Sequence, residues 1–496
     1  MKSRKKAFKI QAVGGIFLTI ISMLKGLVLL PYYFKYIEYS MYGYLITINS
    51  IIGILSFMNF GLNNIVVQKI SNAYAKNNYN LIGIYFANSL IFYIIITLLF
   101  LFLGLGVSFF LQEIMQYSSD KNEILLNAYY ITLITMSLSF FSSIFRGFAQ
   151  SLLNPLFSTI VMILSNIIGI IMVIYLLSEG YHLISIPISF FITEVLIVFF
   201  CAMQVRTLIK KFKIKLQLKK EICLEYYKTI PNLFSLVISN RILENSHSIL
   251  LTFFIGPEST TIYDILRKAS EIILKALNVF NASLLGPYSH LIGESNHDKI
   301  KQVTLKIVFS SLLFSFLCYS IYIATNNTFI YLWIGEDIKL DNNIVIAIGL
   351  GSIFFAMSRL FRNLLLGKEL LLFATSKVYF EGISYVFFAI ILLPFLGMIA
   401  IPISLFIVNF VVIIRFSIKL FNEINYNLEL KVFFNIFSLF ITSFICLYFI
   451  IEYFDKHSWE IFFIKIIVTF ILIVVLEVIF FYTSIKSFIL NRRKLN

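Results

Sequence analysis

The chain has 496 residues, of which 59% are hydrophobic and only 13% are charged, and its formal net charge is +15. Soluble domains use roughly 25% charged residues, so this composition excludes a soluble enzyme and predicts an all-α polytopic membrane protein. The 4 cysteines and 5 histidines are scattered without CxxC or metal-ligand spacing. They therefore provide neither a disulfide framework nor a metal site, and we expect no cofactor.

Apolar runs recur from end to end, each long enough to cross a hydrocarbon core of about 30 Å as a helix. The first run follows the basic start MKSRKKAFKI. It is too long for a signal peptide and lacks a small-residue cleavage site, so we interpret it as an uncleaved first span. The runs predict fourteen transmembrane helices, at 10–33, 42–62, 82–104, 124–146, 156–177, 183–204, 230–255, 262–285, 304–325, 343–366, 375–396, 399–420, 431–451 and 460–483.

The loops on the side of the two termini carry far more lysine and arginine than the opposite loops. The terminal side holds 26 of these cations, and the opposite side holds 4, namely Lys35, Lys121, Lys339 and Lys456. This positive-inside bias predicts that both termini are cytoplasmic. Because the cations flank membrane spans, we expect them to contact anionic lipid headgroups rather than nucleic acid.

The spans divide into two sets of six. We predict an N-terminal six-helix lobe at 1–204, a basic cytoplasmic linker at 205–229, a C-terminal six-helix lobe at 230–421, and two extra transmembrane helices with a basic tail at 422–496. The motif Ser-x-x-Phe-Arg closes spans 4 and 10, so Arg146 and Arg362 correspond in a parallel repeat. Chance similarity between apolar helices is the alternative. Spans 13 and 14 lie outside the repeat and are expected to carry almost no embedded charge.

The eighth span contains the charged segment YDILRKASEIILKALN. Its polar residues recur at helical spacing and share one face: Asp264, Lys268, Glu271, Lys275 and Asn278. A charge that faces lipid costs about 2.5–3.5 kcal/mol, so we expect this face to meet water or opposite charges inside the bundle, with the pairs Asp264–Lys268 and Glu271–Lys275. The alternative, an amphipathic helix on the membrane surface, would reverse the topology of every later loop.

Several other spans carry embedded ionisable residues, and cations outnumber acids among them. This excess predicts a net positive cavity between the two lobes, which suits an anionic substrate because arginine holds phosphate by two-point contacts. The candidate substrate-binding residues are Lys25, Arg146, Arg241, Arg267, Lys268 and Arg362, and Lys275 and Arg359 add to the same excess. For Arg146, Arg359 and Arg362, snorkelling to the headgroups is the alternative. Glu194, Glu381 and Glu477 are interpreted as helix-packing or interfacial residues.

Several local features point to one transporter family. They are the basic start, the stretch LPYYFKYIEYSMYGYL (30–45), NFGLNN (59–64), the KISNAYAKNN that follows, and the layout of six, six and two spans. In these features the chain resembles the polysaccharide flippases, the Wzx-like branch of the multidrug/oligosaccharidyl-lipid/polysaccharide exporter superfamily. Relatives often have Asp before the Gly-Leu of span 2, where this chain has Asn59 and Phe60, so no acid is expected to act there.

The resemblance implies a transporter, not an enzyme, that moves a polyprenyl-diphosphate-linked oligosaccharide, an O-antigen or capsular repeat unit, across the bacterial inner membrane to the outer leaflet. It implies alternating access of a cation-lined cavity. Our hypothesis is that Glu244, Asp264 or Glu271 couples transport to H⁺ or Na⁺. We also expect spans 13 and 14 to hold the prenyl tail. Expected partners are the lipid-linked oligosaccharide, anionic membrane lipids and other polysaccharide-assembly membrane proteins.

Besides a purely structural membrane scaffold, which would leave the charged faces unexplained, three alternatives remain. A multidrug or cation antiporter of the same superfamily would be expected to have an acidic, aromatic pocket, whereas bases are in excess here. A flippase for a lipid-linked peptidoglycan precursor is the second. A membrane polysaccharide polymerase or ligase would be expected to carry a large non-cytoplasmic loop with catalytic residues, whereas the loops near 105–123 and 326–342 are short.

Overall fold

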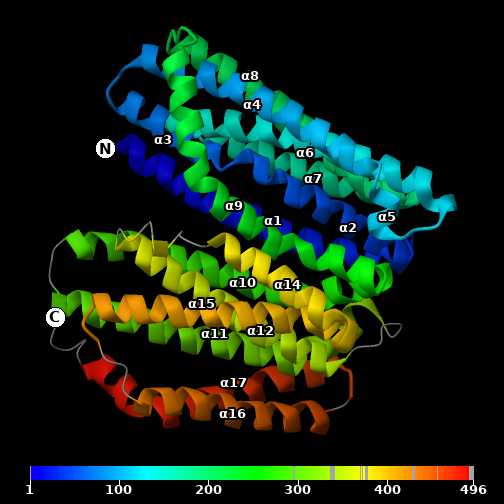
Figure 1. The fold of residues 1–496 in the computed structure, drawn as a ribbon, viewed down its shortest axis with the longest axis vertical. Helices are drawn as coiled ribbons and strands as arrows, with labels where there is room; N and C mark the ends of the chain where they lie inside the picture. The colour runs from blue at the N-terminus through cyan, green and yellow to red at the C-terminus, as the bar shows by residue number, and fades with distance from the viewer. Residues whose placement is uncertain are drawn as a thin grey trace. The chain divides into compact units, whose positions relative to one another are not determined.

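The computed structural model describes residues 2–293, 297–335, 341–368, 370, 373–374, 378–426, 430–454 and 456–490. Lys339, residues 375–377 of the predicted eleventh span, and residues 491–496 of the basic tail lie outside this part. The described chain folds into long helices and contains no strand (Figure 1). The predicted all-α polytopic membrane fold is confirmed.

Eleven segments in the described ranges are long and apolar enough to cross a membrane, and two of them, Tyr39–Ala75 and Val378–Glu423, each hold two α-helices. Two further long helices fall outside this set: α9 (Lys220–Phe254) and α10 (Pro257–Gly293). These two helices contain the embedded charges of the seventh and eighth predicted spans. Their larger number of charges, rather than their lengths, separates them from the more apolar spans.

Contacts divide the chain into two compact units, Met1–Thr261 and Ile262–Asn496, with the boundary inside α10. The predicted linker at 205–229 comprises the end of α8, a short connection and the start of α9. The first unit contains α1 (Lys2–Tyr33), α2 (Tyr39–Leu55), α3 (Leu62–Ala75), α4 (Tyr79–Ser108), the short α5 (Leu111–Met115), α6 (Asn122–Ser151), α7 (Leu156–Ser178), α8 (Ser185–Lys211) and α9.

Helix α6 is the centre of the first unit, where it packs against α2, α3, α4 and α8. Aromatic rings fill its contact with α4: Phe100 and Phe140 lie 5.1 Å apart, and Phe86 and Phe148 lie 4.2 Å apart. The Tyr129 hydroxyl donates to the carbonyl of Gly104 at 2.8 Å. Since lipid tails are as apolar as leucine, close packing and hydrogen bonds of this kind, rather than the hydrophobic effect, hold membrane helices together.

The second predicted span, at 42–62, falls within the candidate membrane segment Tyr39–Ala75, but this segment contains a break. Helix α2 ends at Leu55, a 3-10 turn covers Ser56–Asn59, and α3 begins at Leu62. Between them Phe60 and Gly61 adopt left-handed backbone angles, with φ of 49° and 66°. Tyr93 of α4 donates a hydrogen bond to Asn59 Oδ1 at 3.2 Å, which fixes the break against the neighbouring helix.

The second unit contains the rest of α10, α11 (His297–Ile334), α12 (Asn342–Gly367), α14 (Val378–Leu396), α15 (Ala400–Glu423), α16 (Leu430–Tyr453) and α17 (Trp459–Leu490). Within it α15 packs against α12 and α14, and α11 packs against α12, α16 and α17. Close approach requires a small residue in places. A Cβ added to Gly351 of α12 would lie 2.8 Å from the carbonyl oxygen of Pro402 on α15.

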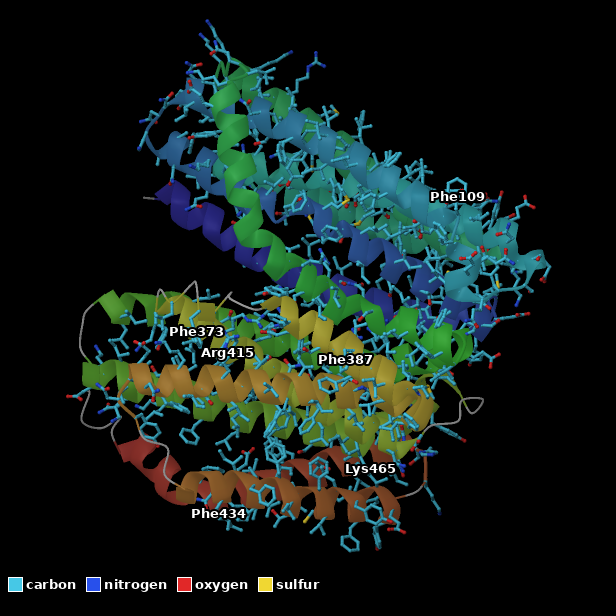
Figure 2. The ribbon with its side chains drawn as sticks, viewed as in Figure 1. Phe109, Phe373, Phe387, Arg415, Phe434 and Lys465 are labelled. Atoms are coloured by element: carbon cyan, nitrogen blue, oxygen red, sulfur yellow. The ribbon has the colours of Figure 1, made fainter. Side chains whose placement is uncertain are left out.

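The last helix carries buried charge, so the expectation that spans 13 and 14 are almost free of it is wrong. Lys465 of α17 is 3% exposed, and its amine donates to the Thr328 hydroxyl of α11 at 2.9 Å (Figure 2). Glu477, three turns further along the same face, is also buried. Helix α17 is therefore held on α11 by polar as well as apolar contacts.

The left-handed turn at Gly61 gives a stability test. In the Gly61→Ala variant an L-residue must adopt φ of 66°, which costs roughly 1–2 kcal/mol. A Cβ at this position meets only Val237 at 3.8 Å, so the loss reflects the backbone rather than a clash. We expect a lower thermal unfolding temperature in detergent. The control is Gly106→Ala in the helical part of α4, where a Cβ meets nothing within 4 Å; an equal effect in both variants would contradict the prediction.

Candidate functional site

A polar cavity of about 400 Å³ lies within the first unit. Its walls come from α1, α2, α6, α7 and α8, and its lining is rich in charged, amide and hydroxyl side chains. The polar lining residues are Lys25, Asn49, Thr132, Thr135, Ser139, Ser142, Arg146, Asn166, Thr193 and Glu194. Two of the predicted substrate-binding residues, Lys25 and Arg146, thus share one cavity although they are far apart in sequence.

Lys25 enters the cavity from α1. Its side chain is half-buried, and its amine lies 4.0 Å from the centre of the Phe190 ring on α8. A cation above an aromatic face is stabilised by about 0.5–2 kcal/mol, depending on how far it is desolvated. The ring thereby holds the ammonium group toward the cavity without neutralising its charge.

Arg146 reaches the cavity from α6, near the end of the helix. Its Nε donates to the carbonyl of Ser142 at 3.2 Å, and its Nη1 lies 3.1 Å from the sulfur of Met162 on α7. Within the described residues these contacts use Nε and Nη1 and fix the plane of the guanidinium. The donors of Nη2 remain for an oxygen inside the cavity, which suits a phosphate.

Glu194 of α8 is the acid in the cavity wall, and the sequence interpretation of it as a packing or interfacial residue missed this place. The carboxylate lies beside the Ser142 hydroxyl and close enough to Arg146 to attract it. Its Oε1 is buried and has no hydrogen-bond partner among the residues that the structure describes. An ionisable residue inside an apolar span is by itself a signal of a site, and that signal was present in the sequence.

One face of α6 forms a ladder of hydroxyl groups. Thr132, Thr135, Ser139 and Ser142 follow one another at intervals of three or four residues and end at Arg146. Each of the four hydroxyls donates to a carbonyl of its own helix, at distances of 2.7 to 3.0 Å. Because the hydrogen is used in this way, the oxygens of Thr132, Thr135 and Ser139 offer lone pairs to the cavity, whereas the Ser142 hydroxyl lies beside Glu194. The wall therefore accepts hydrogen bonds along its length and presents cations at Lys25 and Arg146.

The charged residues of α9 lie in the same unit, beside the helix that lines the cavity. Arg241 and Glu244 are 3.9 Å apart and partly exposed. Asn245 packs against Gly53 of α2, and Gly53 lines the cavity. A Cβ added to Gly53 would lie 2.6 Å from Asn245 Oδ1. Arg241 is thus one turn from a residue that touches the cavity wall, but it is not among the lining residues.

The charged face of α10 forms ion pairs within its own helix. Lys268 lies 2.7 Å from Asp264, which confirms that predicted pair. Arg267 lies 2.8 Å from Glu271, so the strong partner of Glu271 is Arg267 rather than the predicted Lys275, which attracts it from further away.

The opposite face of α10 packs into the second unit. The carbonyl of Leu266 accepts hydrogen bonds from Tyr322 at 2.8 Å and Asn326 at 3.1 Å, both on α11. The hydroxyl of Ser270 on α10 is hydrogen-bonded to the hydroxyl of Ser352 on α12 at 2.9 Å. These contacts hold α10 among neighbouring helices, which favours a helix of the bundle over the surface helix that the sequence left open.

Arg362, the repeat partner of Arg146, occupies a different environment. Its guanidinium forms an ion pair with Glu381 of α14, and both side chains are buried. The ring of Phe416 lies 5.6 Å from the guanidinium on another side. Arg359 stacks on Phe355 at 4.7 Å. In the same unit Arg415 stacks on Phe373 at 4.8 Å (Figure 2). Arg362 and Glu381 are therefore placed to hold α12 and α14 together.

The comparisons with known proteins agree with this fold. The sequence matches the family described as polysaccharide biosynthesis protein over residues 14–292. No protein of curated function matches the sequence. Among solved structures, the lipid II flippase MurJ in an inward closed conformation is similar with a TM-score of 0.71 and 17% identity, covering 96% of this chain and 99% of that one. An inward-facing multidrug resistance MATE family transporter of the MOP superfamily is similar with a TM-score of 0.66 and 12% identity, covering 82% of this chain and 95% of that one.

The cavity predicts selective chemical labelling. In a variant without native cysteines, Ser139→Cys should react with a small water-soluble thiol reagent, since residue 139 lines the cavity. Ser137→Cys is the control, because residue 137 is on the same helix but is 5% exposed and outside the lining. We expect labelling at 139 at least about tenfold faster, because thiols packed away from water react poorly. Equal rates at the two positions would show that the cavity does not hold water.

The Arg362–Glu381 pair gives a second test. Removing one partner leaves a buried charge without its counter-ion, which costs roughly 3–5 kcal/mol. Arg362→Leu and Glu381→Leu should each lower the thermal unfolding temperature strongly. The unfolding temperature of the double variant should fall by much less than the sum of the two single decreases, because no charge is left buried. If the losses simply add, the two residues do not act as a pair.

Proposed function

Since the chain belongs to the polysaccharide biosynthesis protein family, we propose that it is a flippase for a polyprenyl-diphosphate-linked oligosaccharide, an O-antigen or capsular repeat unit. It moves this lipid from the cytoplasmic to the outer leaflet of the bacterial inner membrane by alternating access, with both termini in the cytoplasm. The fold shared with a lipid II flippase and with MATE transporters supports a transporter of this superfamily.

The observation that carries the proposal is the combination of groups in the cavity of the first unit. Lys25 and the Nη2 donors of Arg146 supply positive charge for a diphosphate. The hydroxyl ladder of α6 supplies acceptors for sugar hydroxyls, which are donors. A purely apolar drug would leave these polar groups without partners, and that costs binding free energy.

A cavity is required because neither part of the headgroup crosses hydrocarbon alone. Burying a charged phosphate without partners costs far more than the few kcal/mol of a lost hydrogen bond. In this proposal the cavity replaces the water around the headgroup, while the prenyl chain stays in lipid. An inside-negative potential favours the outward step by about 2.3 kcal/mol per charge per 100 mV. Glu244, Asp264 and Glu271 remain our candidates for H⁺ or Na⁺ coupling.

A multidrug or cation antiporter is the second candidate, and two observations favour it. Glu194 places an acid in the same cavity, and its Oε1 has no hydrogen-bond partner in the described part of the chain. The MATE transporters share the fold. The two candidates make opposite demands on the cavity. An organic cation needs Glu194 and is repelled by Lys25 and Arg146, whereas a diphosphate needs the two cations.

The test is a strain that depends on this chain for export of its lipid-linked oligosaccharide. Losing one hydrogen bond to a charged group costs about 1.5–3 kcal/mol, which is roughly a tenfold loss or more in transition-state binding. Lys25→Gln and Arg146→Gln should therefore slow flipping at least tenfold. The lipid-linked oligosaccharide should then accumulate on the inner leaflet. The matched control is Arg415→Gln, which removes an arginine stacked on Phe373 in the second unit.

Glu194→Gln separates the two candidates. A drug antiporter would lose export of organic cations in this variant and would keep it when Lys25 or Arg146 is neutralised. Normal flipping in both the Lys25→Gln and the Arg146→Gln variants would remove these residues from the substrate site. A null strain without accumulation of the lipid-linked oligosaccharide would overturn the flippase proposal itself.

A further inference from the structure

The connection between α8 and α9 has an unusual sequence, FKIKLQLK at 212–219, in which apolar and polar residues alternate. It forms neither helix nor strand after the turn that ends α8 (Figure 1). We refer to residues 212–219 as the strap. Phe212 and Lys213 belong to that turn, and Lys213 has φ of 51°. In an extended chain over 214–219, the alternation places the lysines on one side and the apolar residues on the other.

The first half of the strap is anchored on the first unit. Phe212 stacks on Tyr79 at 5.5 Å, with nearly parallel rings, and lies 5.9 Å from Tyr74. Ile214 is 6% exposed. Its amide donates to the carbonyl of Ile209 at 3.0 Å. The apolar side of the strap therefore begins as part of the protein core.

The second half is held to α4 through main-chain groups. Any Cβ at Gly83 of α4 would collide with the carbonyl of Lys215, so the glycine permits this close approach. The amide of Lys219 donates to Asn88 Oδ1 at 3.4 Å. The lysine side chains take no part in either contact, so the strap keeps its course whatever those side chains bind.

Beyond Ile214 the protein no longer covers the apolar side of the strap. Leu216 is 48% exposed and Leu218 is 62% exposed. The lysines of the strap, Lys213, Lys215 and Lys219, are exposed as well. A fixed backbone thus presents two leucines and a row of ammonium groups outward.

The position of the strap along the spans identifies its surroundings. Helix α4 begins at Tyr79 and α8 ends at Lys211, and both helices are long and apolar enough to cross a membrane. Phe212 touches Tyr79, so the strap lies where α4 begins and α8 ends. The last turns of α8 carry Arg206, Lys210 and Lys211, and cations at the end of an apolar helix are typical of the headgroup level. Leucine at this depth meets acyl chains, and lysine meets phosphates. We propose that the strap is a binding surface for anionic phospholipids, with Leu216 and Leu218 in the acyl boundary and the lysines on the headgroup phosphates.

This proposal does not depend on what the protein transports. It needs only the membrane fold and the side of the membrane on which α8 ends. The positive-inside bias of the loops assigns that side to the cytoplasm. Juxtamembrane lysine clusters attract the anionic lipids of the cytoplasmic leaflet. A nucleic acid or an acidic protein would bind the ammonium groups but would leave Leu216 and Leu218 in water.

The test uses the full chain in nanodiscs with a single tryptophan. Trp333 and Trp459, the 2 native tryptophans, are replaced by phenylalanine, and L218W is introduced. Two nanodisc samples are compared. One contains brominated phosphatidylglycerol in unlabelled phosphatidylcholine, and the other contains brominated phosphatidylcholine in unlabelled phosphatidylglycerol. The quenching of the tryptophan fluorescence is measured in each. We expect quenching by the anionic lipid to be at least about twofold stronger. The triple variant K213Q/K215Q/K219Q should abolish the preference, since the anchoring of the strap uses main-chain atoms and Phe212.

The matched control is F109W at the other end of α4, where Phe109 is 84% exposed (Figure 2). The sequence has no Lys or Arg from Asn77 to Asp120, so both lipids should quench this tryptophan equally. Equal quenching by the two lipids at L218W would overturn the anionic-lipid site. Absence of quenching by either lipid would show that the strap lies in water, and would overturn the proposal as well. Normal or impaired flipping does not enter this measurement, so the two proposals fail separately.

Discussion

The cost of placing a charge among apolar helices governs this structure. Each embedded ion needs an opposite charge, a hydrogen-bond partner or water. Arg362 has Glu381, and Lys465 has the hydroxyl of Thr328. Asp264 with Lys268, and Arg267 with Glu271, are paired along one helix. Lys25 and Arg146 instead face a polar cavity, where the ring of Phe190 and the sulfur of Met162 orient them without neutralising them.

The two arginines of the repeated motif show how similar sequences acquire different roles. Both stand near the end of a long helix, in Ser-x-x-Phe-Arg. Arg362 is closed into a buried ion pair because α14 supplies Glu381 directly to its guanidinium. Arg146 is met on α7 by the weakly polar Met162, and the acid near it, Glu194, keeps one oxygen without a partner in the described chain. Positive charge thus stays accessible at Arg146 but not at Arg362, which is why we place the substrate there.

Parts of the candidate site were visible in the sequence. Lys25 and Arg146 stood out as embedded cations, and the stripe of hydroxyls on α6 follows helical spacing that ends at Arg146. Glu194 was missed because it has no charged neighbour one turn away, and a lone acid looks the same whether it packs or faces a cavity. The partner of Glu271 was predicted wrongly, since Lys275 and Arg267 are both four residues away and spacing alone does not choose between them.

The sequence by itself determined the properties that depend on composition and period along one chain. These are the membrane-spanning helices, their approximate ends and the charged face of α10, because hydrocarbon thickness and helical geometry act on each segment separately. Only the tertiary structure decided which charges are neutralised, where span 2 breaks, and that α17 carries a buried lysine onto α11. Those outcomes depend on side chains brought from distant helices. No spacing within one segment specifies which distant residue will be the partner.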